Sequence, residues 1–180
     1  MLKLLHNQIN FEVTRMFKKG DYVINSNNGI CKIEDTITMD MSNGKKEYYL
    51  LIPINEQTAK VYIPVDIAAQ RIRLAMNKEQ ALQFINSIKD IEETYIENEK
   101  EREKTYKEAI NSREPERMVG IIKTLYLRKI ERVGVGKKIT TIDERYFKLA
   151  ENYLHGELAF ALQVEKEEIN QMILKNIEGY

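Results

Sequence analysis

Two different patterns of hydrophobic and polar positions divide the chain. Up to about Met76, the apolar residues are mostly β-branched or aromatic and come in short runs, which is typical of strands. Beyond that point they recur every three or four residues, which is typical of helices. We therefore place a domain boundary at about Met76 and expect a β domain over residues 16–76 and a helical domain over residues 77–180.

The first half contains four clear strand patterns and a shorter fifth. Turn-forming sequences separate several of them, in Asn25-Ser-Asn-Asn-Gly29 and Ser42-Asn-Gly44. Apolar side chains at Cys31, Ile33 and Ile37 alternate with polar ones, so one face of the sheet is expected to be wet. Such a sheet would close as a small barrel or roll. The expected strands are 22–24, 29–40, 47–54, 60–63 and 71–74.

The second half predicts helices with recognisable ends. Asn77-Lys-Glu-Gln80 and Thr141-Ile-Asp-Glu144 have the form of capping boxes, and Pro115 suits a first helical turn. Gly134-Val-Gly136 suits a stop, and the acidic run Glu165-Lys-Glu-Glu168 suits a helix start. The fold class is therefore α+β, with a small β-barrel or roll followed by an all-α helical bundle. The expected helices are 77–91, 99–111, 115–134, 141–162 and 166–177.

The first fifteen residues lack either pattern. Their apolar run, Leu4-Leu5, is shorter than the about 7 to 15 residues of a secretory signal. Met16 directly precedes the patterned sequence and suggests an alternative start, which would make residues 1–15 an appendage. No run approaches the roughly 18 apolar residues of a membrane span. The single Cys31 cannot form an intramolecular disulfide, so we expect a cytoplasmic protein without a membrane partner.

Charge is balanced over the whole chain but not along it. The 180 residues carry 28 Lys plus Arg and 28 Asp plus Glu. Residues 99–148 hold fourteen basic and nine acidic residues, whereas both flanking helical stretches are net acidic. Cations that converge on one face would bind phosphates. Interspersed charges are also what a solvated helical surface shows to water, and both interpretations stay open here.

Residues suited to catalysis are few. His155 and Glu157 could share a metal or a proton, but no second His or useful Cys accompanies them, which favours a surface or capping histidine. Cys31 is best interpreted as a small buried hydrophobe. No Walker loop, glycine-rich dinucleotide turn or CxxC pair occurs. We expect no catalytic residue, metal, cofactor or small-molecule substrate, and no enzyme.

Seven short motifs follow one another across both halves, from Met16 to about Leu162. The first four are Met16-Phe-Lys-Lys-Gly-Asp-Tyr-Val, Asn28-Gly-Ile-Cys-Lys-Ile-Glu34, Lys46-Glu-Tyr-Tyr-Leu-Leu51 and Val61-Tyr-Ile-Pro-Val65. The others are Ile121-Ile-Lys-Thr-Leu125 with Arg128, Asp143-Glu-Arg145 and Leu154-His-Gly-Glu-Leu-Ala159. In this order and spacing the sequence resembles CarD/CdnL-type bacterial transcription regulators. Its first half resembles the N-terminal module of these regulators, and the same module occurs in transcription-repair coupling factors.

The resemblance implies a Tudor-like module that docks on the RNA polymerase β subunit, partly by adding a strand edge. It also implies a helical domain that meets promoter DNA at the upstream edge of the melted region and prolongs the open complex. This chain departs from the family pattern at two places. The family's wedge Trp is absent, with Arg102 near its place and Tyr95 or Tyr106 as substitute aromatics. Positions that are arginine in some relatives are Met39 and Tyr62 here.

These implications give two sets of candidate residues and two functions. Polymerase binding is expected at Met39, Lys45, Lys46, Lys60 and Tyr62. Contact with promoter DNA, with weak sequence preference, is expected at Arg102, Lys104, Lys107, Lys123, Arg128 and Arg145. The alternative function is a protein-interaction adaptor that docks on polymerase or another partner without touching DNA.

Overall fold

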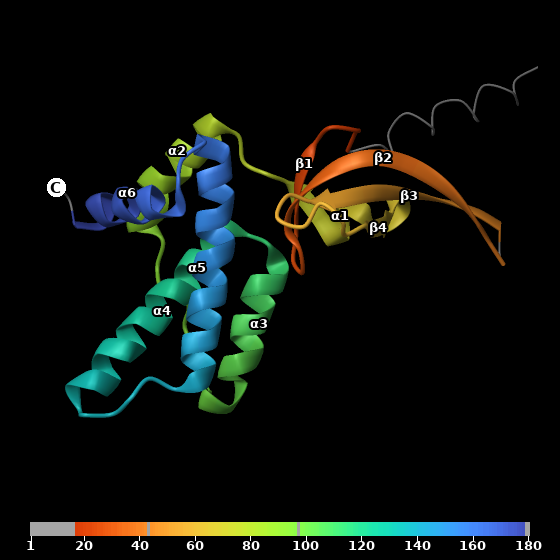
Figure 1. Ribbon diagram of the computed structural model, residues 1–180. Helices are drawn as coiled ribbons and strands as arrows, with labels where there is room; N and C mark the ends of the chain where they lie inside the picture. Colours follow the sequence, from red (N-terminus) through yellow and green to blue (C-terminus); the bar gives the residue numbers. More distant parts are fainter. Residues whose placement is uncertain (1–16, 43, 97, 179–180) are drawn as a thin grey trace, which may run out of the picture. The chain divides into compact units, whose positions relative to one another are not determined.

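The computed structural model describes residues 17–42, 44–96 and 98–178 (Figure 1). The chain divides into two compact units, Met1–Leu74 and Ala75–Tyr180. The first unit holds an antiparallel sheet and the second holds the long helices, which confirms the α+β class. The expected appendage at residues 1–15 lies outside the described residues. Among the described helices, none combines the length and the apolar character needed to cross a membrane.

Five strands form the sheet of the first unit, in the order β4-β3-β2-β1-β5, and every neighbouring pair is antiparallel. The second and third strands form a long hairpin (Figure 1). The short strands β4 and β5 form the two edges. The strands are β1 Tyr22–Asn25, β2 Gly29–Met41, β3 Gly44–Pro53, β4 Val61–Pro64 and β5 Ile72–Leu74.

One face of this sheet carries the core of the first unit. Its fully buried members include Val23, Cys31 and Leu51. The Tyr49 hydroxyl donates to the backbone carbonyl of Phe17 at 3.1 Å, and the two rings meet edge to face. Two short helical turns that the sequence pattern did not indicate follow β4 and bring Ala68 into this core. They are η1 Val65–Ile67 and α1 Ala68–Arg71.

A β-bulge in β2 changes which side chains face the core. Ile33 lies opposite Leu51, but Asp35 lies opposite Leu50, so that Glu34 is one extra residue on β2. One inserted residue moves every later side chain to the other face of the strand. The expectation that Ile37 continues the face of Ile33 is therefore wrong.

The helices of the second unit begin and end close to the sequence signals. The capping box at Asn77 is confirmed, with the Asn77 side chain accepting from Gln80 N and the Gln80 side chain accepting from Asn77 N. The second box is shifted by one residue, because Thr140 caps α5 by accepting from Asp143 N at 3.1 Å. The helices are α2 Lys78–Ser87, η2 Ile88–Asp90, η3 Glu99–Glu101, α3 Arg102–Ser112, α4 Pro115–Gly134, α5 Thr141–Leu162 and α6 Lys166–Glu178.

The second unit has two apolar clusters that share α4 and α5. One lies against α2 and α6 and includes Leu158 and Ile169, and the other lies against α3 and includes Leu125. The chain between η2 and η3 crosses α4 at Gly120. There Thr94 N donates to Thr124 Oγ1 at 2.9 Å, and the Thr124 hydroxyl donates to the backbone carbonyl of Thr94 at 3.0 Å. This crossing fixes the position from which η3 and α3 start.

Candidate functional site

The strand register places three of the expected polymerase-binding residues on one face of the sheet. Met39 lies opposite Lys46, and Tyr62 lies opposite Leu50. Residues directly opposite in an antiparallel pair share a face, and so do residues two apart in one strand. Met39, Lys46 and Tyr62 therefore project from the same side of the sheet. This is the side away from the core. The core side carries Tyr49 and Ile63, which lie opposite each other and are buried.

Half-buried apolar side chains fill the space between these residues. Ile37 lies opposite Tyr48 on the same face, and Leu50 lies beside them. Tyr62 is 42% exposed. We call this group, made of Ile37, Met39, Tyr48, Leu50 and Tyr62 with Lys46, the outer sheet face. Such a patch, with an exposed aromatic ring and one cation, suits contact with another protein.

Lys45 and Lys60, the other two residues expected to bind polymerase, lie elsewhere on the first unit. Lys45 lies opposite Asp40, and it projects from the face opposite to that of Lys46. Lys60 precedes β4 and is exposed. Lys46 itself forms an ion pair with Asp66 at 3.2 Å. The expected set is thus split between the two faces and the loop before β4.

Two of the cations expected on DNA lie on the solvent side of α3. Lys104 and Lys107 are exposed, whereas Tyr106, Ala109 and Ile110 on the other side of the helix are buried. The side chain of neither lysine forms a hydrogen bond or an ion pair with a residue that the structure describes. Both ammonium groups are therefore available to an anion from solution.

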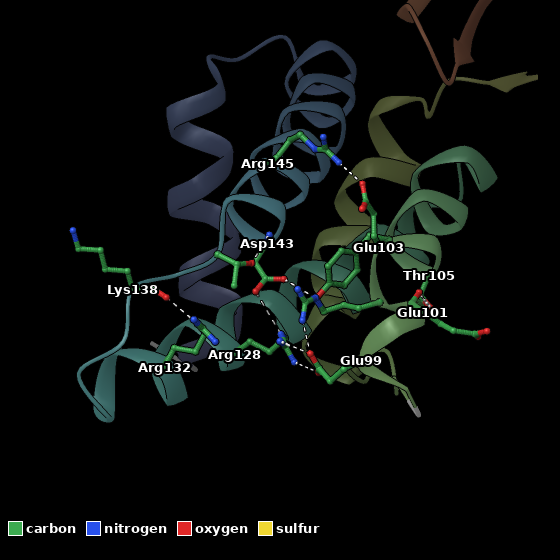
Figure 2. Close-up of polar contacts among 12 residues, drawn as sticks. Glu99, Glu101, Glu103, Thr105, Arg128, Arg132, Lys138, Asp143 and Arg145 are labelled. Atoms are coloured by element: carbon green, nitrogen blue, oxygen red, sulfur yellow. Dashed lines mark hydrogen bonds and ion pairs between the residues drawn. The ribbon is translucent and has the colours of Figure 1, made fainter.

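Arg102 and Arg128 instead converge on two carboxylates inside the second unit. Arg128 forms a bidentate pair with Glu99, with Nη1 to Oε1 at 2.6 Å and Nη2 to Oε2 at 3.1 Å, and Arg102 Nη1 also contacts Glu99 Oε2 (Figure 2). The Nε atoms of the two arginines lie 3.2 and 3.7 Å from the carboxylate of Asp143. The hydrogen bonds from Arg128 hold the pKa of Glu99 below its usual value.

Asp143 is the buried centre of this network. Its side chain is fully buried, and its Oδ1 accepts a hydrogen bond from the Tyr106 hydroxyl at 3.2 Å. Burial, with the negative charge of Asp143, raises the pKa of Tyr106 well above its usual value. Tyr106 is therefore a core residue and does not supply an exposed aromatic to DNA. Four elements meet here: η3 with Glu99, α3 with Arg102, α4 with Arg128 and α5 with Asp143.

Two further cations of the expected DNA set also make contacts within the second unit. Arg145 pairs with Glu103 (Figure 2), and its guanidinium lies 4.7 Å from the centroid of the Tyr146 ring. Lys123 Nζ donates to the backbone carbonyls of Ile88, at 2.7 Å, and Ile91. Lys123 therefore holds the chain that follows α2, while Arg102 and Arg128 hold η3. The sequence spacing gave no sign of these long-range partners, although Glu99 and Arg102 have the spacing of a helical ion pair.

The other candidate residues have structural surroundings. Cys31 is fully buried, as expected, and burial raises the pKa of its thiol to about 11. His155 is half-buried on α5, and Glu157 accepts from the backbone N of Met76 at 3.0 Å. Within residues 17–42, 44–96 and 98–178, no three His, Cys, Asp or Glu side chains gather as a metal site would require. Tyr95 is 83% exposed, but Glu92 and Glu93 precede it and would repel a phosphate backbone.

Two family matches cover most of the chain. Residues 17–75 match the CarD-like/TRCF RID domain, and residues 83–174 match the CarD C-terminal domain. The sheet, the helical domain and these matches define a transcription-related protein of a class that interacts with RNA polymerase. The chain belongs to the CarD-like family, whose members are transcription factors. No curated protein matches the chain.

Proposed function

We propose that this chain is a transcription regulator that binds the β subunit of RNA polymerase through its sheet domain. Its helical domain then contacts promoter DNA and modulates the stability of the open complex. The outer sheet face carries the proposal, because it joins Met39, Lys46 and Tyr62 around an apolar patch. The RID match over residues 17–75 supports the same partner.

Polymerase binding is tested by capturing purified RNA polymerase with the full chain. Tyr62→Ala removes an exposed ring from the patch, and truncating a central interface aromatic costs enough to weaken binding by about fivefold or more. Tyr95→Ala is the matched control, since Tyr95 is an exposed tyrosine in the other unit. Equal binding by the Tyr62 and Tyr95 variants would remove the outer sheet face from the proposal.

The DNA contact rests on the exposed cations of α3. Phosphate contacts by Lys104 and Lys107 would position the domain on a duplex without reading its sequence. Each phosphate contact contributes a slope of about −0.9 in log K against log salt, so the double alanine variant should bind with a slope less steep by about 1.8. Lys18→Ala with Lys19→Ala removes the same charge from the sheet domain and serves as the control. A slope shared by both double variants would contradict the contact.

Open-complex modulation follows from linkage. A protein that binds the open complex more tightly than the closed one shifts the population by that difference in free energy. With no Trp in the chain, the contribution must come from phosphate contacts and from polymerase anchoring. The lifetime of a promoter complex is measured with and without saturating protein. An unchanged lifetime, with polymerase binding intact, would refute this part of the function.

The adaptor function is supported by a different observation. Four of the six cations expected on DNA make contacts within the helical domain, and an apolar stripe is exposed on the second half of α4, at Tyr126, Ile130 and Val133. An exposed apolar stripe suits a protein partner better than a phosphate backbone. A chain that binds polymerase but no duplex DNA, even at low salt, would be an adaptor.

A further inference from the structure

Two arginines of the helical domain, Arg102 and Arg128, are mostly buried but pair with an exposed carboxylate, that of Glu99. Arg102 and Arg128 are 15% and 21% exposed, and both direct their Nη atoms at Glu99. The Glu99 side chain, in contrast, is 63% exposed. The carboxylate therefore covers the open side of a half-buried pair of guanidinium groups.

Asp143 holds the two guanidinium groups from the buried side. It lies against the Nε atom of each arginine, while its Oδ1 also accepts from the Tyr106 hydroxyl. Each Nε atom forms an ion pair with Asp143 on the buried side, and Nη atoms of both arginines are directed at Glu99. Arg102 and Arg128 come from α3 and α4, so two helices packed against α5 fix their separation. The pair is thus positioned independently of Glu99.

Glu99 is held much less firmly than the arginines. It belongs to η3, a turn of three residues in which no residue is buried. Ion pairs of exposed carboxylates with arginine typically contribute about 0 to 1 kcal/mol each to stability in water, and the bidentate geometry places the Arg128 pair at the upper end of that range. An anion from solution can therefore compete for the same Nη atoms at small cost.

The chemistry of the pair fits a phosphate group. The planar guanidinium binds carboxylate and phosphate oxygens in the same bidentate manner. Two arginines with Asp143 leave one positive charge, which Glu99 neutralises. A phosphodiester also carries one negative charge, so it can replace Glu99 without leaving a charge uncompensated.

We propose that Arg102 and Arg128 form a phosphate-binding site, and that Glu99 occupies this site in the free protein until a backbone phosphate of DNA displaces it. Glu99 then lowers the affinity of the free helical domain for DNA. The DNA source of the phosphate rests on the proposed function, whereas the anion site itself does not. The site also accounts for how arginines with internal partners can still contact DNA.

The test compares two alanine variants of the full chain. Glu99→Ala removes the competing carboxylate, and Glu101→Ala removes an equal charge two residues away, from a side chain that points away from Arg128 (Figure 2). Binding of a labelled duplex is measured by fluorescence anisotropy at low and moderate salt. Glu99→Ala should bind about three- to tenfold more tightly than Glu101→Ala, the range given by losing one or two exposed ion pairs. Equal affinities of the two variants for the duplex would overturn the proposal that a DNA phosphate displaces Glu99.

A second arm uses inorganic phosphate as the probe. Arginine side-chain NMR signals of Glu99→Ala should shift saturably with phosphate, while those of the wild type and of Glu101→Ala should shift less at the same concentration. If the phosphate arm succeeds and no variant binds duplex DNA, the anion site stands and the proposed DNA function fails. If the wild type binds DNA but Glu99→Ala responds like Glu101→Ala in both arms, the site is overturned and the proposed function stands. If neither arm responds, both fail.

Discussion

Replacing Asp143 by alanine removes a carboxylate of α5 that contacts residues of both α3 and α4. The Tyr106 hydroxyl loses its hydrogen-bond acceptor, and Arg102 and Arg128 lose the carboxylate that forms ion pairs with their Nε atoms. Tyr106 is fully buried, so no water can take the place of the lost oxygen without a change in packing. The two arginines keep Glu99 and retain partial contact with solvent.

Breaking a buried ion pair by removing one partner costs about 3 to 5 kcal/mol of unfolding free energy. Because Glu99 still binds both arginines, we expect Asp143→Ala to lie at the lower end, about 3 kcal/mol. Asp143→Asn keeps an acceptor for the Tyr106 hydroxyl and loses only the charge. We expect that variant to cost about 1 to 2 kcal/mol.

Urea unfolding of the full chain, followed by far-ultraviolet circular dichroism, measures this loss because the helical unit dominates the signal. Glu144→Ala is the matched control, since Glu144 is the next residue on α5 and forms an exposed ion pair with Lys148 across the helix surface. Its unfolding midpoint should be nearly that of the wild type. A cost below about 1 kcal/mol for Asp143→Ala, or a midpoint like that of Glu144→Ala, would refute the role of the network.

Three further outcomes are expected. Gly120→Ala places a Cβ 2.7 Å from Thr94 Oγ1 and should lower the free energy of unfolding by about 1 to 3 kcal/mol. Gly134→Ala, whose Cβ has no atom within 4 Å, should raise that free energy by about 0.5 kcal/mol, and thermal unfolding measures both variants. Cys31, buried and with a raised pKa of about 11, should react with thiol reagents only at the rate of unfolding, and rapid labelling of the native chain would contradict this. Burial lowers the pKa of His155, so the unfolded chain binds the proton more readily, and stability should fall as pH drops below about 6.5. His155→Gln should flatten this part of the stability profile, and identical profiles between pH 7.5 and 5 would refute the assignment.

Elements with local signals could be predicted from the sequence, and those that depend on tertiary packing could not. Asn77 caps its helix through two bonds within four residues, so its sequence context was sufficient. The bulge at Glu34 has no such signature, because it appears only when β2 and β3 are paired. The turns η1 and α1 also depend on packing, since Ala68 joins a core made by distant strands. Pattern alone therefore found the strands but misplaced Ile37.

The cations of the helical domain show the same limit. Helical spacing correctly placed Lys104 and Lys107 on one exposed side of α3. The partners of Arg128 and Arg145 lie 29 and 42 residues away along the chain, and no periodic pattern connects them. Counting basic residues consequently overestimated the charge that faces solvent. The carboxylates that reduce it, Glu99 and Glu103, belong to the same net-basic stretch.

The family resemblance places Arg102 near the position of a wedge tryptophan, and the structure shows what this arginine contacts. Arg102 is not an outward side chain with a different chemistry, because its guanidinium turns inward to Asp143. A wedge needs an apolar ring that projects from the protein into the groove, whereas this position is tied to a buried carboxylate and to α4 through Glu99. Arg102 therefore supplies no ring that could deform DNA, and its contacts with Asp143 and Glu99 instead fix the start of α3. In the proposed function, contact with DNA at Arg102 is made through phosphates that displace Glu99, and its strength is therefore expected to depend on salt.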